Sequence, residues 1–324
     1  MADTLSEFEI IRRYFTPATS HTELAVGDDC ALIRVAPGAE LAVSTDMLVS
    51  GRHFHADADP EKIGHKALAV NLSDLAAMGA TPRWATLSLA LPRADEVWLA
   101  DFSKGFLRLA QRYDVDLVGG DTTRGPLTIC VQIMGEVPVR HALRRDGARP
   151  DDEVWVSGEV GDAALLLAHL AGNVDLDSRE VTVCAQRLHE PEPRVALGEA
   201  LRGVAHSCID ISDGLAADLG HILERSSVGA VIELSLVPRS SVLERHLSVP
   251  AALRALLAGG DDYELCFTAP ATRHDEVLRI ADETATPVAC VGRIVPGEGL
   301  TVLGERGEPV EIGTAGWDHF GSAA

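Results

Sequence analysis

Acidic residues that follow glycine or end a strand-like run recur along the whole of this chain. The segments that carry them are Gly27-Asp28-Asp29, Ser44-Thr45-Asp46, Asn71-Leu72-Ser73-Asp74, Gly119-Gly120-Asp121-Thr122, Asp210-Ile211-Ser212-Asp213-Gly214 and Gly259-Gly260-Asp261-Asp262. Carboxylates on such turns hold hard cations such as Mg²⁺, usually beside a substrate phosphate. One turn of this kind is ordinary surface chemistry, but several of them indicate a shared metal–phosphate centre.

Two of these segments repeat one scheme. In Gly119-Gly120-Asp121 the glycines let backbone N–H groups approach a polyphosphate, and the aspartate can bind its metal. Taken alone, such a segment is more often an ordinary glycine-rich turn with an aspartate cap. In the second half, Ser212 or Asp213 can cap a helix that begins at Leu215. Capping and metal binding are compatible, so the cap does not exclude a functional site.

Two other acidic segments, with three aspartates between them, are costly without a partner. Asp74 lies on an otherwise apolar helix, where an isolated carboxylate is strongly unfavourable, so it needs a cation or an ion pair, for example with Lys66. Asp28 and Asp29 directly precede the apolar run 30–33. Adjacent like charges beside an apolar run indicate a shared cation, although a solvated turn also explains them.

The candidate basic and aromatic residues have ordinary alternatives. Three arginines could neutralise phosphate charge, although most linker arginines are only solvated: Arg124, Arg144 and Arg145. His53 and His55 follow a strand, but no cysteine or third histidine supports a transition-metal site there. Trp317 either covers a small core patch or offers a surface on which a flat ring stacks.

Composition narrows the class of protein. A chain of 324 residues predicts two domains. The net charge of −21 argues against nucleic acid and against an anionic membrane surface as partners. The six cysteines form no Cys-x-x-Cys pair, and the sequence shows no signal peptide and no apolar run long enough to span a bilayer. We therefore expect a cytoplasmic protein with reduced thiols. There is no P-loop, dinucleotide fingerprint, protein-kinase His-Arg-Asp loop or Gly-x-Ser-x-Gly elbow.

The elements that must position these residues alternate between helix and strand, an α/β or α+β pattern. Expected strands in the first half are 31–35, 41–44, 86–91, 116–118 and 127–137, and expected helices are 8–15, 61–78 and 95–113. A turn at Pro37-Gly38 is expected to join the first two strands. An Arg/Gly/Pro/Asp-rich stretch at 140–152 predicts the domain boundary. Beyond it we expect strands at 154–157, up to Asp210, 230–236, 264–268 and 288–294, and helices at 163–170, 215–225 and 251–257.

Together, the motifs resemble a known family. They are Gly27-Asp28-Asp29-Cys30-Ala31, Ser44-Thr45-Asp46, the run KALAVNLSDLAAMGA at 66–80, Gly119-Gly120-Asp121-Thr122-Thr123-Arg124, Asp210-Ile211-Ser212-Asp213-Gly214-Leu215 and Gly260-Asp261-Asp262-Tyr263-Glu264-Leu265. In this order, and over nearly the whole chain, they are similar to thiamine-monophosphate kinases of the aminoimidazole-ribonucleotide-synthetase-like superfamily. The resemblance implies a two-domain α/β (α+β) fold. Its N-terminal domain, 1–139, would bind ATP and Mg²⁺ and form a dimer barrel through its sheet, and its C-terminal α/β domain, 140–324, would complete the active site.

The resemblance also implies the activity and its residues. The activity is ATP-dependent phosphorylation of thiamine monophosphate to thiamine diphosphate by in-line transfer with several Mg²⁺ ions and no general base. Implied metal ligands are Asp29, Ser44, Thr45, Asp46, Asp74, Asp121, Asp210 and Asp213. Implied ATP contacts are Gly120, Asp121, Arg145 and Ser212, and implied contacts to thiamine monophosphate are His53, Asp261 and Trp317. Relatives often carry Glu at position 261 and Tyr at position 317.

Two alternatives remain open from the sequence. The first is a sister enzyme of the superfamily. A selenophosphate-forming member would be expected to carry a reactive Cys or selenocysteine with a nearby Lys before Gly27, and a hydrogenase-maturation member a C-terminal Cys; this sequence has neither. The second is a non-enzymatic, acidic cation-binding protein, which explains the net charge but not the position of the aspartates on glycine turns.

Overall fold

The computed structural model describes residues 5–311. Its chain divides into two compact units: Met1–Leu75 with Ala80–Arg140, and Ala76–Gly79 with His141–Ala324. The division after Arg140 lies close to the boundary expected from composition, while the separate roles of the two domains stay predictions. Among residues 5–311, no helix is both long enough and apolar enough to cross a bilayer.

The first unit is built on a four-stranded sheet in the order β1-β4-β2-β3. Its strands are β1 (Ala39–Val49), β2 (Thr81–Leu91), β3 (Asp116–Arg124) and β4 (Thr128–Pro138). β4 pairs antiparallel with β1 and β2, whereas β2 and β3 are parallel. β1 and β3 are therefore the two edge strands, and both carry predicted site residues.

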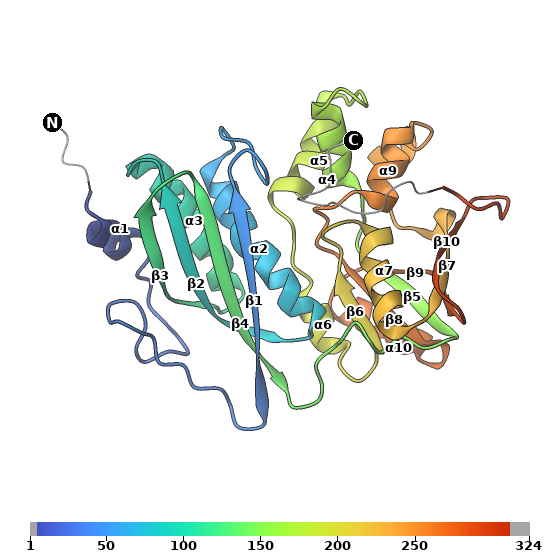
Figure 1. Cartoon of the computed structure of the whole chain (residues 1–324), viewed down its shortest axis with the longest axis horizontal. Coiled ribbons are helices and arrows are strands. Elements are labelled where there is room, and N and C mark those ends of the chain that lie inside the picture. Colours follow the sequence, from blue (N-terminus) through green and yellow to red (C-terminus); the bar gives the residue numbers. More distant parts are fainter. Residues whose placement is uncertain (1–4, 312–324) are drawn as a thin grey trace. The chain divides into compact units, whose positions relative to one another are not determined.

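Helices α2 (Pro60–Ala77) and α3 (Glu96–Arg112) lie together on one face of this sheet (Figure 1). Leu68 and Leu72 on α2 are completely buried. The long helix with small side chains was expected at 61–78, and it packs as closely as its composition requires. A short amphipathic helix, α1 (Glu7–Tyr14), begins with a capping box between Ser6 and Glu9.

The strand expected at 31–35 is wrong. Segment 16–38 is largely irregular, and its β pairing consists of isolated bridges, Leu24 with Leu32 and Val26 with Asp28. Ala31 and Ile33 instead pack on a small core that includes Trp84. Their alternation reflects packing of a loop on the sheet face, which has the same period of two as a strand. The expected turn at Pro37-Gly38 is present, closed by a hydrogen bond from the Ala39 backbone N–H to the Ala36 carbonyl at 3.1 Å, but it leads from this loop into β1 and does not join two strands.

The second unit contains a six-stranded sheet in the order β10-β7-β9-β5-β8-β6. Its strands are β5 (Asp152–Ser157), β6 (Ser207–Asp210), β7 (Gly229–Glu233), β8 (Leu265–Pro270), β9 (Val288–Val295) and β10 (Gly299–Leu303). Its α-helices are α4 (Asp162–Leu170), α5 (Ser178–His189), α6 (Val195–Ala200), α7 (Leu215–Ser226), α8 (Ser241–His246), α9 (Pro250–Ala258) and α10 (His274–Glu283). The secondary structure expected from the sequence did not include α5, α6, α8, α10 and β10. On α10, for example, the described buried side chains are Val277, Ile280 and Ala281, so the apolar pattern is short.

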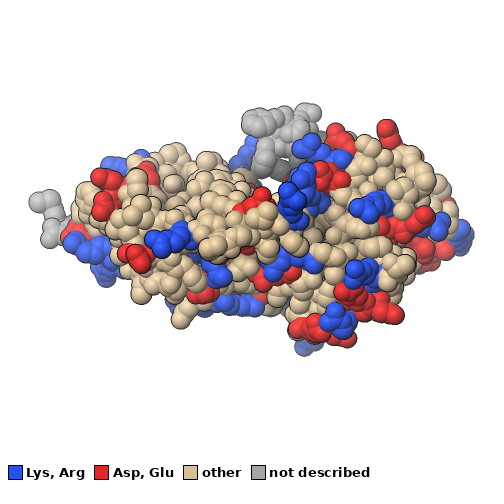
Figure 2. Space-filling view, turned by 90° about the horizontal axis from the view of Figure 1, so that it is seen from below, with Lys and Arg blue, Asp and Glu red and all other residues tan. Residues whose placement is uncertain are grey.

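On the face in Figure 2, basic side chains lie among acidic ones, with uncharged surface between them. That face offers no broad basic area of the kind that binds a nucleic-acid backbone.

Candidate functional site

Ser44, Asp46 and Asp74 form the first group of predicted site residues. Alternation along β1 turns Ser44 and Asp46 toward α2. Ser44 Oγ donates a short hydrogen bond to Asp74 Oδ2, and the Asp46 backbone N–H donates to Asn71 Oδ1 at 3.2 Å. The prediction that Asn71 and Asp74 share one helix face is confirmed, since both contact β1.

The electrostatics of this group favour a cation. Burial, followed by the neighbouring charge of Asp74, raises the pKa of Asp46 from 3.8 to about 7. Two carboxylates in a half-buried position repel each other, and a divalent cation between them would offset both charges. Hydroxyl and carboxylate oxygens are the donors that Mg²⁺ prefers, so the residues present fit this metal.

Thr45 and His53 flank this group. The Gln132 side-chain amide donates to Thr45 Oγ1 at 3.4 Å, so the Thr45 side chain lies on the opposite sheet face from Ser44 and Asp46. His53 lies in the turn after β1, where its Nδ1 accepts a hydrogen bond from the Val49 backbone N–H at 3.0 Å. The neutral ring consequently carries its proton on Nε2.

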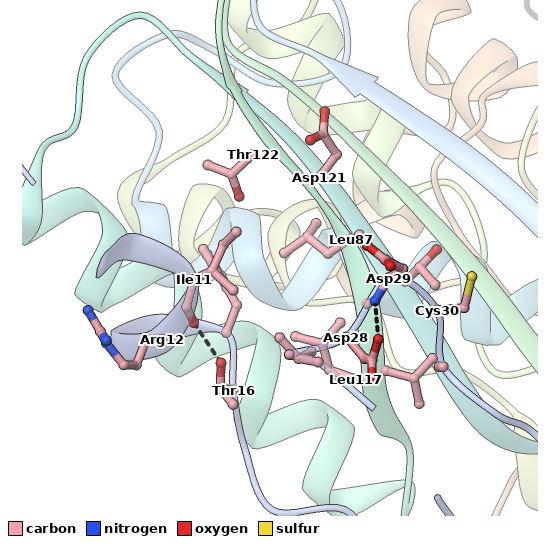
Figure 3. Close-up of a pocket in the computed structure, with 18 of the residues that line it drawn as sticks. Ile11, Arg12, Thr16, Asp28, Asp29, Cys30, Leu87, Leu117, Asp121 and Thr122 are labelled. Atoms are coloured by element: carbon pink, nitrogen blue, oxygen red, sulfur yellow. Dashed lines mark hydrogen bonds between the residues drawn. The ribbon is translucent and has the colours of Figure 1, made fainter. Parts of the chain in front are cut away.

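A cavity of about 790 Å³ contains the second group. Asp29, Gly120 and Asp121 line it, although they come from segments far apart in the chain (Figure 3). Its apolar walls are formed by residues of α1, by the residue that follows this helix and by the sheet: Phe8, Ile11, Phe15, Leu87, Leu117 and Val118. A cavity with an apolar wall, a glycine turn and two carboxylates suits a nucleotide with a bound metal.

Gly120 is required by the backbone itself. Its φ is +142°, and an added Cβ would lie 1.8 Å from the Leu87 carbonyl oxygen. An added Cβ at Gly119, by contrast, would meet nothing within 4 Å. From the sequence, both glycines were predicted to let the backbone approach a phosphate closely. The structure requires glycine only at position 120, because of its contact with β2.

The first two groups lie at the same level of the sheet on opposite edges. In register, Asp46 pairs with Val131, Val131 with Leu87, and Leu87 with Gly120, directly before Asp121. Three strand spacings of about 4.8 Å each put the two edge backbones about 14 Å apart. The predicted ligands of this unit therefore do not form one cluster within a single chain.

The third group lies in the second unit. Asp210 ends β6 and is buried, and the turn 211–214 leads into α7. The Asp261 backbone N–H donates to the Ser212 carbonyl at 2.9 Å, and Tyr263 N–H donates to the Ile211 carbonyl at 2.8 Å. These bonds place Asp261 beside Ser212, although about fifty residues separate them in the chain.

The Asp261 loop also contains residues that the sequence reading missed. Asp261 and Tyr263 have φ values of +71° and +54°, in the left-handed region that non-glycine residues seldom adopt. The Tyr263 hydroxyl donates to Asp261 Oδ1 at 3.0 Å. Between them, Asp262 accepts the Gly161 backbone N–H through both oxygens, at 2.9 and 3.0 Å. Left-handed backbone at non-glycine positions leaves no signal in the sequence.

The remaining predicted residues are less constrained. The Arg145 side chain is exposed, while its carbonyl accepts a hydrogen bond from Ser226 Oγ at 2.9 Å. Its neighbour Arg144 is already paired with Asp146 at 2.6 Å. Trp317 lies outside the described residues. Within 5–311, no three His, Cys, Asp or Glu side chains are arranged to hold a metal ion by themselves.

Comparison with known proteins gives the family. Residues 27–137 match the family model described as AIR synthase related protein, N-terminal domain, and residues 149–305 match the model for its C-terminal domain. Thiamine-monophosphate kinase of Escherichia coli K12 is 47% identical over 319 residues, which cover 97% of this chain and 98% of the relative. The enzyme of the same name from Haemophilus influenzae is 42% identical over 323 residues, covering 98% of both chains.

Comparison with solved structures gives the same family. Thiamine-monophosphate kinase from Stenotrophomonas maltophilia K279a matches with a TM-score of 0.83 and 45% identity, over 90% of this chain and 92% of that one. A structure described as AaThiL complexed with AMPPCP and TMP matches with a TM-score of 0.77 and 33% identity, over 91% and 92% of the two chains. The two-domain α/β fold expected from the motifs is thereby confirmed, and this chain belongs to the thiamine-monophosphate kinase family.

Proposed function

We propose that this protein transfers the γ-phosphoryl group of ATP to the phosphate of thiamine monophosphate, giving ADP and thiamine diphosphate. The observation that carries this conclusion is the 47% identity, over nearly the full length, to a thiamine-monophosphate kinase. The relative solved with AMPPCP, an analogue of ATP, and with TMP supports both substrates.

ATP is proposed to bind in the cavity of the first unit. Its apolar wall suits a purine base, and the glycine turn at Gly120 and Asp121 suits the phosphates and their metal. Ser212 and Arg145 are proposed as further contacts to ATP. His53, Asp261 and Trp317 are proposed as contacts to thiamine monophosphate.

Mg²⁺ is the proposed metal, held by Asp29, Ser44, Thr45, Asp46, Asp74, Asp121, Asp210 and Asp213. Its chemistry there is to neutralise charge on phosphate oxygens, which matters because both substrates are anions. The raised pKa of Asp46 supports this assignment, because a cation would relieve the repulsion that burial and Asp74 impose.

The acceptor needs little activation. A phosphate oxygen of thiamine monophosphate is already a competent nucleophile, so no residue is assigned as a general base. The chain's own task is to hold the two anions in line. The left-handed backbone of the Asp261 loop and the hydrogen bond from Tyr263 support such a holding role.

A homodimer is proposed as the working form. On the edge strand β1, Leu41, Val43 and Met47 are 43%, 52% and 54% exposed and share one face. An exposed apolar edge strand is a typical pairing surface. In such a dimer, β1 of one protomer is proposed to lie beside β3 of its partner, which would bring Asp46 close to Asp121 of the partner subunit. The two aspartates could then belong to one site, although the width of the sheet separates them within a single chain.

A cytoplasmic location is also proposed. All six cysteines are free thiols, as is usual in a reducing compartment.

The test is release of ADP from Mg²⁺-ATP with thiamine monophosphate, with thiamine, and with no acceptor. Turnover with thiamine monophosphate alone, and thiamine diphosphate as the product, is the expected result. Mg²⁺-dependent ATP binding without such turnover would indicate a sister enzyme, and no saturable ATP binding would indicate a non-enzymatic cation-binding protein.

A further inference from the structure

The turn before α7 has an unusual hydrogen-bond arrangement. The backbone N–H groups of Ser212, Asp213 and Gly214 all donate to one oxygen, Asp218 Oδ2, each at 3.0 Å. Asp218 is 2% exposed and lies one turn inside the helix. In return, its own backbone N–H donates to the Gly214 carbonyl at 3.0 Å.

This arrangement replaces an ordinary N-cap. The N-cap position is Gly214, which has no side chain with which to cap the helix. Its φ is +117°, and an added Cβ would lie 2.7 Å from the Ala258 carbonyl carbon, so another residue does not fit. Asp218 therefore supplies, from inside the helix, the acceptor that a capping side chain normally provides.

The three backbone N–H groups of this turn are not available to bind a phosphate. Three convergent backbone N–H groups at a helix start are a common binding site for phosphate. Here Asp218 Oδ2 already occupies all three of them. A nucleotide phosphate is therefore kept from these amides, and the turn can offer only the side chains of Ser212 and Asp213.

We propose that Asp218 is a positioning residue of the kinase site: it fixes the turn 212–214 so that the Ser212 hydroxyl and the Asp213 carboxylate face the nucleotide and its metal. This inference rests on the proposed function. Asp218 itself touches neither substrate.

The position of this turn also affects the Asp261 loop, which is proposed to contact thiamine monophosphate. The Ser212 carbonyl accepts the Asp261 backbone N–H at 2.9 Å, and an added Cβ at Gly260 would lie 2.1 Å from the same oxygen. The turn and the Asp261 loop are thus packed without spare room. Asp218 holds one side of this contact, so loosening the turn also displaces the backbone of Asp261.

The experiment compares Asp218→Asn and Asp218→Ala with Ile222→Val. Ile222 is a fully buried residue of the same helix, and its replacement weakens packing without touching the turn. Hydrogen exchange of peptides spanning 208–217 is measured without substrates, and kcat and the Mg²⁺ concentration for half-maximal rate are measured with them.

For Asp218→Ala we expect faster exchange in the 208–217 peptides, a kcat that is about tenfold to hundredfold lower, and a higher Mg²⁺ requirement. Asp218→Asn should change in the same direction but less, because its amide oxygen still accepts hydrogen bonds, only more weakly than a carboxylate. Asp218→Asn keeps the shape of the side chain and carries the test if Asp218→Ala does not fold. Exchange or kcat within twofold of the Ile222→Val values would overturn the proposal. Failure of the proposed function is distinguishable, because the wild type itself would then lack turnover with thiamine monophosphate.

Discussion

Asp46 and Asp121 lie within one residue of the same level of one four-stranded sheet, on its two opposite edge strands. About 14 Å of sheet separates their backbones. Because Mg²⁺ binds its ligands at about 2 Å, one ion cannot contact both residues of a single chain. Either the two aspartates serve different ions, or they meet across two chains.

Mixed dimers distinguish these cases. Asp46→Asn and Asp121→Asn should each abolish turnover as homodimers, since each removes a carboxylate that the proposed metal site needs. If β1 and the partner's β3 share a site, a heterodimer of the two variants contains one doubly damaged site and one intact site. We expect about half of the wild-type activity from heterodimers purified through two different tags.

The matched control is the pair Asp46→Asn and Asp74→Asn. These residues belong to the same group, joined through Ser44 and α2. Every site of their heterodimer is damaged, so no activity should return. Inactive Asp46→Asn/Asp121→Asn heterodimers would show that each site lies within one chain.

Asp46→Asn should stabilise the metal-free protein while it abolishes turnover. The pKa of Asp46 is raised from 3.8 to about 7, so the folded state binds a proton that the unfolded state releases over this range. Stability therefore falls as the pH rises from 3.8 to about 7 and stays low above it. The variant lacks this penalty, and we expect a gain on the order of 3 kcal/mol at pH 8 that shrinks below about 1 kcal/mol at pH 4.

Urea unfolding in EDTA at the two pH values measures this gain. Mg²⁺ at about 100 times its Kd should then stabilise the wild type by about 2.7 kcal/mol, and the variant by much less. A variant that is less stable than the wild type at pH 8 would show that the Asp46 carboxylate is stabilised by partners other than a cation.

Much of this architecture is readable from the sequence, because long regular elements leave periodic patterns. The helix carrying Asn71 and Asp74 was predicted to within a residue, and its small side chains correctly indicated close packing. The loop around Ala31 and Ile33 was taken for a strand because a loop packed on a sheet can show the same alternation.

The relation of the site residues depends on information that is not local. Strand order alone puts Asp46 and Asp121 on opposite edges, and no motif near either residue indicates it. Asp218 looks like an ordinary polar residue of a helix, and its role appears only when the turn folds back on it. The motifs thus indicated candidate site residues but not how the fold groups them.

Gly120→Ala and Gly119→Ala should differ sharply, although both residues line the cavity. The added methyl group at Gly120 would lie 1.8 Å from the Leu87 carbonyl oxygen, and the φ of +142° is itself unfavourable for alanine. We expect Gly120→Ala to lose more than about 2 kcal/mol of stability and most of its ATP binding. Gly119→Ala meets nothing within 4 Å and should keep its stability. Thermal unfolding and calorimetric titration with AMPPCP measure both properties, and equal behaviour of the two variants would contradict the assignment.

Tyr263→Phe should weaken binding of thiamine monophosphate selectively. The Tyr263 hydroxyl donates to Asp261 Oδ1 at 3.0 Å, and without it the carboxylate is less firmly oriented. A hydrogen bond to a charged group contributes about 1.5–3 kcal/mol, so we expect KM for thiamine monophosphate to rise about tenfold or more, with KM for ATP unchanged. Tyr14→Phe is the control, because Tyr14 belongs to the first unit, away from the Asp261 loop in sequence, and its hydroxyl makes a 3.5 Å contact with the Glu96 carbonyl of that same unit. Equal changes in both KM values, or none in Tyr263→Phe, would show that Asp261 does not orient the acceptor through this bond. The selective outcome would also explain how the shorter aspartate serves at position 261, since a side chain held by its neighbour needs less reach of its own.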